Sequence, residues 1–127
     1  MKNKPLIIIL LSLGLFYACQ NNNGTAKIEY TKEINVGKIN VGDTIIKKFN
    51  IKNISSNTLK IKEIKTSCGC TVAKLNDSIV DANSSTHLLV TFIAEKDDKG
   101  IIEKSIVIDA NTKPNFNVMY LKGDVID

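Results

Sequence analysis

The chain has 127 residues, of which 17 are basic and 13 acidic, for a net charge of +4 at neutral pH. This length fits one domain with its own hydrophobic core. Every basic residue is a lysine and the charge excess is small, so we expect no nucleic-acid ligand, which requires a concentrated basic surface.

The first 18 residues have the parts of a secretory signal peptide. A short basic start over 1–4 is followed by an apolar run over 6–17 and by Ala18 before Cys19. This run is shorter than the roughly 20 apolar residues of a transmembrane helix. Residues 16–19 resemble a relaxed bacterial lipobox, which implies cleavage after Ala18 and lipidation of Cys19. The alternatives are an ordinary cleaved signal with an unrelated cysteine, and an uncleaved short anchor.

Residues 19–26 are expected to form a flexible tether, because this polar segment offers no apolar surface to bury. Several acyl chains on Cys19 would hold the protein on a membrane, since each buried methylene contributes about 0.8 kcal/mol. Gln20 stands in place of Asp after the lipidated cysteine, which favours the outer membrane by the common sorting rule. The tether has no acidic cluster, and we therefore expect the protein to face the periplasm.

Residues 27–127 show short apolar–polar alternations separated by turn residues, the pattern of β-strands. The clearest strand is 86–94, where Leu88, Val90 and Phe92 share one face. Seven or eight such strands predict an all-β fold, an Ig-like antiparallel β-sandwich. The candidate segments for these strands are 27–30, 33–39, 44–53, 58–66, 71–75, 79–80, 86–94, 101–109 and 116–125.

The order of motifs in this region resembles a bacterial Ig-like group catalogued as domain of unknown function family 1573. Residues 34–43 resemble its F-G-x-I-x-x-G-D opening, 49–59 its F-x-x-x-N-x-G-x-x-x-L segment, and 66–71 its S-C-G-C-T signature. Residues 79–84 stand in place of its I-x-P-G turn, and 89–92 in place of its V-x-F strand. The group is related to the Hydin and major-sperm-protein sandwiches, and its members are mostly exported or lipid-anchored proteins of Gram-negative bacteria. The resemblance implies a sandwich and an exported location, without an established biochemical role.

Cys68 and Cys70 are the one pair of residues in the sequence with clear chemical potential. In an extended strand their Cα atoms would lie roughly 6–7 Å apart, near the upper limit for a disulfide, and Gly69 would let the backbone bring them closer. A bridge over so short a loop would add little stability and would exchange readily. Three interpretations stay open: a structural turn, thiol–disulfide chemistry, and a soft-metal site for Cu(I) or Zn.

Few other residues could complete a metal site. His87 is the only histidine and Met119 the only methionine outside the signal, and a lone histidine at the start of a strand is usually a surface residue. Asp97 and Asp98 lie between lysines without EF-hand spacing, so we expect both to be solvated. The sequence has no hydrolase, phosphate-binding or zinc-protease motif, and we expect neither enzyme activity nor a cofactor.

The sequence thus predicts a lipid-anchored cell-envelope protein whose sandwich is a non-catalytic binding or scaffolding module. Its contacts would be the membrane, through the lipid on Cys19, and an envelope protein that meets the loops and an exposed sheet edge. The alternative is an envelope thiol-redox or soft-metal-binding protein that uses Cys68 and Cys70.

Overall fold

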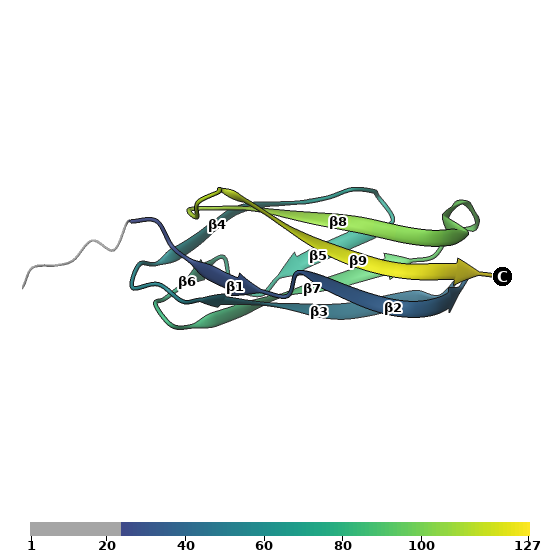
Figure 1. The fold of residues 1–127 in the computed structure, drawn as a ribbon, viewed down its shortest axis with the longest axis horizontal. Coiled ribbons are helices and arrows are strands. Elements are labelled where there is room, and N and C mark those ends of the chain that lie inside the picture. Colours follow the sequence, from purple (N-terminus) through teal and green to yellow (C-terminus); the bar gives the residue numbers. More distant parts are fainter. Residues whose placement is uncertain (1–23) are drawn as a thin grey trace, which may run out of the picture.

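The computed structural model describes residues 24–127, which form nine β-strands in two sheets (Figure 1). The signal peptide of residues 1–18, the lipidation site Cys19 and most of the tether lie outside the described residues. The described part has no helix whose length and apolar character would let it span a bilayer. The strands are β1 (Ile28–Tyr30), β2 (Glu33–Asn40), β3 (Thr44–Asn53), β4 (Leu59–Thr66), β5 (Thr71–Leu75), β6 (Ile79–Val80), β7 (Ser85–Ile93), β8 (Gly100–Ala110) and β9 (Phe116–Ile126), with one 3-10 turn, η1 (Lys96–Asp98).

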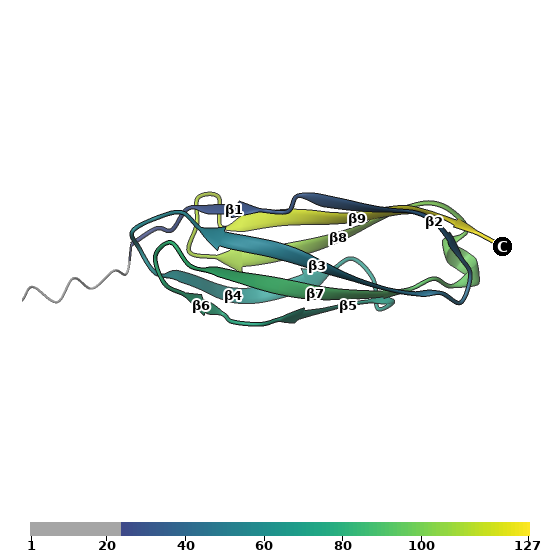
Figure 2. The ribbon, with the colours of Figure 1, turned by 90° about the horizontal axis from the view of Figure 1, so that it is seen from below.

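The two sheets pack face to face, which confirms the predicted sandwich (Figure 2). One sheet has the strand order β1-β3-β7-β5, and the other has the order β2-β9-β8-β4-β6. The expectation of purely antiparallel pairing is wrong at one place, because β2 pairs with β9 in parallel. The chain keeps its direction when it passes from β1 in the first sheet to β2 in the second, and β9 runs the same way.

Alternate side chains of both sheets form the core, because successive residues of a strand point to opposite faces. In β7, Leu88, Val90 and Phe92 are fully buried, as predicted from the alternation. The other fully buried large apolar side chains are Phe49, Ile51, Leu59, Ile106, Ile108, Met119 and Leu121.

Two details differ from the sequence expectation. All nine candidate segments form strands, the short β1 and β6 included, so the count is one above the expected seven or eight. The folded unit also begins before residue 27. Ala26 is buried and its N–H donates to the Asn111 carbonyl at 2.8 Å, while Asn111 Nδ2 donates to the Gly24 carbonyl at 3.0 Å. The last three residues of the expected tether are therefore held on the sandwich by these hydrogen bonds.

Candidate functional site

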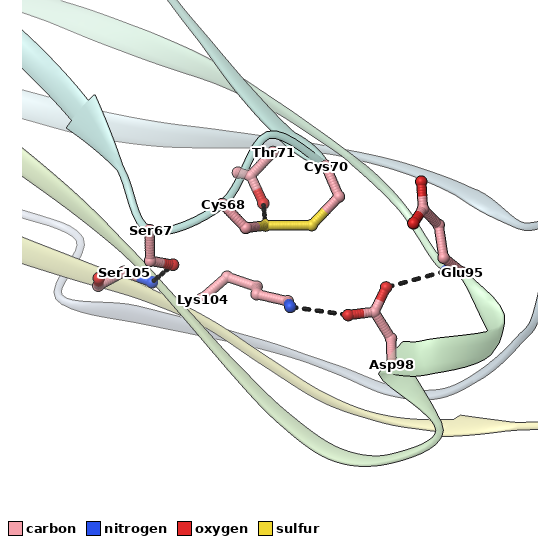
Figure 3. Close-up of polar contacts among 8 residues, drawn as sticks. All are labelled: Ser67, Cys68, Cys70, Thr71, Glu95, Asp98, Lys104 and Ser105. Atoms are coloured by element: carbon pink, nitrogen blue, oxygen red, sulfur yellow. Dashed lines mark hydrogen bonds and ion pairs between the residues drawn. A yellow bond between two sulfur atoms is a disulfide. The ribbon is translucent and has the colours of Figure 1, made fainter.

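A disulfide joins Cys68 to Cys70 in the turn between β4 and β5 (Figure 3). Their Cα atoms are 5.4 Å apart, closer than in an extended strand, because residues 67–70 form a turn. The Thr71 hydroxyl lies 3.4 Å from Cys68 Sγ. Since β4 and β5 belong to different sheets, the bridge lies on a crossover between the two layers of the sandwich.

The cysteine turn is hydrogen-bonded to both sheets. The Ile93 N–H, at the end of β7, donates to the Cys70 carbonyl at 3.2 Å. On the other sheet, the Ser67 N–H donates to the Ser105 carbonyl and the Ser105 N–H donates to Ser67 Oγ, both at 3.0 Å (Figure 3). The half-buried cysteines therefore have a fixed position relative to both layers.

An inward-facing lysine lies on β8 at this end of the sandwich. Lys104 shares a face of β8 with the buried Ile106, and only 16% of its side chain is exposed. Its ammonium lies 2.8 Å from Asp98 Oδ1 and 5.5 Å from the centre of the Phe92 ring. The second oxygen of Asp98 accepts a hydrogen bond from the Glu95 N–H at 2.9 Å (Figure 3). Lys104 and Asp98 thereby connect β8 to the 3-10 turn.

The prediction that the two aspartates are solvated is wrong for Asp98. Burial raises the pKa of the Asp98 carboxyl, but the hydrogen bond from Lys104, the hydrogen bond from the Glu95 N–H and the charge of Lys104 all lower it. The lowering effects prevail, and the pKa lies below its ordinary value of 3.8. Asp97, one residue earlier, is exposed as predicted.

His87 lies away from the cysteines, and Met119 is fully buried in the core. His87 pairs with Asn50 across β3 and β7, six residues before Ile93, which is roughly 20 Å along the strand. Within residues 24–127, no group of three or more His, Cys, Asp or Glu side chains is placed to hold a metal ion. The soft-metal interpretation therefore gains no ligand from His87.

The outer face of the four-stranded sheet carries an apolar patch that the sequence analysis missed. This outer patch consists of Ile46, Val72, Leu89 and Ile93, whose exposed fractions are 57%, 62%, 40% and 47%. Ile46 and Val72 lie on either side of Thr91 in one row across β3, β7 and β5. A signal was present in the sequence, because Leu89 and Ile93 stand at outward positions of β7, where a strand with one face in water usually has polar residues.

A comparison with protein families decides the family. The family model described as "Protein of unknown function (DUF1573)" matches residues 27–125. The chain belongs to the DUF1573 family. This confirms the family expected from the motifs, with the cysteine signature at 66–71. The DUF1573 description assigns no activity, and a search of curated proteins finds no match.

Solved structures similar to this DUF1573 chain share its sandwich. A protein of unknown function from Porphyromonas gingivalis W83 superposes with a TM-score of 0.73 at 18% identity, over 86% of this chain and 50% of that one. The ASH/PapD-like domain 7 of human CEP192 gives 0.65 at 12% identity, over 81% and 87%. The secreted serine protease VesC from Vibrio cholerae gives 0.63 at 10% identity, over 84% of this chain but only 24% of the protease. At these identities the likeness shows the Ig-like fold alone.

Proposed function

We propose that this DUF1573 protein is a lipid-anchored module of the cell envelope that binds a protein partner without catalysis. Cys19 would carry the lipid, and the outer membrane, on its periplasmic side, would be the location. The observation that carries the proposal is the edge strand β5 beside the apolar outer patch. An open strand edge next to exposed apolar side chains is a common protein-binding surface.

The position of Gly24 supports an anchor at one end of the sandwich. Ile28, close to Gly24, pairs with Asn53 at one end of β3, whereas the pair of Thr44 and Ile93 lies at the other end, nine residues or about 30 Å away (Figure 1). A lipid on Cys19, five residues before Gly24, would hold the first end within about 18 Å of the bilayer. The cysteine turn, bonded to Ile93, would then lie toward the end far from the membrane.

The anchor and the binding function can be tested separately. Mass spectrometry of the protein extracted from its own envelope should find a chain that starts at acylated Cys19, and Cys19→Ser should abolish the acylation. A product that keeps residues 1–18, or that lacks acyl chains, would overturn the anchor.

For binding, a photo-cross-linking residue is placed in turn at exposed positions of the sandwich in living cells. The expected result is a reproducible cross-link to one envelope protein. If every surface position gives cross-links only to lipid or none at all, the binding function is wrong.

The disulfide favours a second candidate function, thiol–disulfide exchange. A thiolate from a partner protein's reduced cysteine pair would attack one sulfur of the Cys68–Cys70 bridge and break the S–S bond, forming a mixed disulfide and releasing the other sulfur as a thiolate. The partner's second thiolate would then attack the mixed disulfide. The partner pair is thereby oxidised, and Cys68 and Cys70 receive two electrons and two protons.

Redox titration distinguishes this candidate from a structural bridge. We expect the Cys68–Cys70 bridge of the folded protein to equilibrate with a glutathione buffer. The double variant Cys68→Ser, Cys70→Ser should lower the free energy of unfolding by only about 1–2 kcal/mol, because the closed loop is so short. If the bridge resists reduction until the protein unfolds, the exchange function is excluded.

A further inference from the structure

We propose that the edge of β5, together with the outer patch, binds an extended segment of a partner protein that carries an apolar and an acidic residue two positions apart, on the same face of the strand. The segment would add to the four-stranded sheet as a fifth strand beside β5. This inference rests on the proposed binding function and names its surface and the chemistry of its partner.

The four sheet edges differ in how well they could accept a new strand. β1 and β6 have only three and two residues, and the register of β2 shifts between Asn35 and Lys38. Short length and bulges are the devices by which proteins protect strand edges. β5 instead pairs with β7 in an unbroken register from Thr71 to Leu75. Among the described strands, β5 is therefore the edge best suited to strand addition.

The main-chain groups of β5 that face the open side follow from its pairing with β7. The Ile93 N–H donates to the Cys70 carbonyl, and the Asn76 N–H donates to the His87 carbonyl. The main-chain N–H and C=O groups of the even-numbered residues of β5 therefore point toward β7. The main-chain N–H and C=O groups of Ala73 and Leu75 consequently point away from β7, toward the open side of β5. A partner strand would form its hydrogen bonds with these groups.

The outer patch continues from this edge across the sheet. Val72 lies on β5 itself, and Leu89 lies on β7 between Lys48 of β3 and Lys74 of β5. A shallow hollow beside Leu89 is lined by Lys74, Leu75, Asn76 and His87. An added strand would place an apolar side chain next to Val72 and an acidic one within reach of Lys74.

The charges on this face decide the occupant. Its basic residues are Lys48, Lys52 and Lys74, and the acidic residue Glu29 lies opposite Lys52 across β1 and β3. A second copy of the chain would bring its own Lys74 to the same edge. Like charges on neighbouring strands destabilise the pairing. A bilayer could cover the apolar patch but could not satisfy the open main-chain groups. An acidic, apolar polypeptide satisfies both.

The test uses the full chain purified in detergent and a capped, fluorescent peptide of about ten residues. Every second residue of the peptide is alternately valine and glutamate, and the remaining residues are threonine, so that valine and glutamate share one face of the strand. We expect saturable binding below about 1 mM, read by fluorescence anisotropy. Replacing every glutamate of the peptide by lysine should weaken binding about 5–10-fold, because the attraction to Lys74 becomes repulsion. Peptides with proline at every second position should not bind, because proline has no N–H.

Hydrogen exchange then locates the peptide. The amides of Ala73 and Leu75 should become protected, since they would donate to the added strand. Val72→Glu should weaken binding at least about 10-fold through charge repulsion and loss of apolar contact, whereas Ile101→Glu should have no effect. Ile101 is the matched control because it is 84% exposed on the other sheet.

Three results would overturn the proposal. They are the absence of peptide binding at about 1 mM, binding that leaves the amides of Ala73 and Leu75 unprotected, and equal effects of Val72→Glu and Ile101→Glu. Protection of β5 by anionic lipid vesicles, with no preference among the peptides, would point to a membrane surface and would overturn it as well. In cells, cross-links from Ile101 but not from Val72 would leave the binding function intact and remove only this surface.

Discussion

Lys104 and Asp98 form an ion pair with 2.8 Å between the ammonium and the carboxylate, although Lys104 occupies a core-facing position of β8. An inward-facing ammonium is costly unless it finds an opposite charge. Asp98 supplies that charge from the 3-10 turn, and the Phe92 ring lies 5.5 Å from the same ammonium. The pair thus closes the end of the sandwich where the disulfide lies.

Removal of the carboxylate should destabilise the fold. We expect Asp98→Ala to lower the free energy of unfolding by about 1–3 kcal/mol, because Lys104 would keep its charge in a half-buried position without a partner. Urea denaturation at neutral pH measures the effect. Asp97→Ala, at the exposed neighbouring residue, is the matched control and should change stability by less than about 0.5 kcal/mol. Equal losses in the two variants would contradict the role of the ion pair.

The same pair predicts a pH dependence. The pKa of Asp98 is lowered in the folded protein, so the folded state favours the charged carboxylate. Its contribution to stability is fully present above the ordinary pKa of 3.8 and is lost as the pH falls through the lower folded value. The stability difference between the wild type and Asp98→Asn, measured by urea denaturation, should therefore shrink below about pH 4. A difference that stays constant down to pH 2 would exclude this linkage.

Asn53 should be among the polar residues most sensitive to substitution. Its side chain is fully buried, and its Nδ2 lies 2.7 Å from the Asn57 carbonyl and 3.1 Å from the Val80 carbonyl. Its Oδ1 accepts a hydrogen bond from the Ser55 hydroxyl at 2.7 Å. We expect Asn53→Leu to cost about 2–4 kcal/mol, because these buried groups would lose their partner.

The control for this substitution is Asn50→Ala, on the exposed face of the same strand, which should cost less than about 0.5 kcal/mol. Thermal unfolding followed by circular dichroism is sufficient to rank the two variants. If the Asn53→Leu and Asn50→Ala variants unfold at the same temperature, the buried amide of Asn53 does not stabilise the turn after β3.

The parallel pair of β2 and β9 depends on a glycine. A Cβ at Gly123 would lie 2.8 Å from Val36 Cγ2 and 3.2 Å from the Gly37 carbonyl oxygen. Gly123→Ala should therefore push β2 away from β9 and lower the free energy of unfolding by about 1–3 kcal/mol. Gly69→Ala, between the cysteines, is the comparison, since a Cβ there meets no atom within 4 Å. Similar stability of the two variants would show that β2 adapts without cost.

Much of the fold could be predicted because strand alternation is a local property. The inward positions of Leu88, Val90 and Phe92, and the turn residues between strands, can be read from neighbouring residues alone. The family motif at 66–71 likewise needs no coordinates. The parallel partner of β2 could not be read in this way, because it depends on residues about 90 positions later in the chain.

The candidate site shows the same division. By itself, the sequence determined that two cysteines lie one residue apart and that short amphipathic strands must bury one face. Only the tertiary structure decided that Asp98 meets Lys104, that His87 lies far from the cysteines, and that β5 ends a sheet with its outer patch open. Periodicity within a strand is set by the backbone geometry of adjacent residues, whereas partners and edges are set by which distant strands come together.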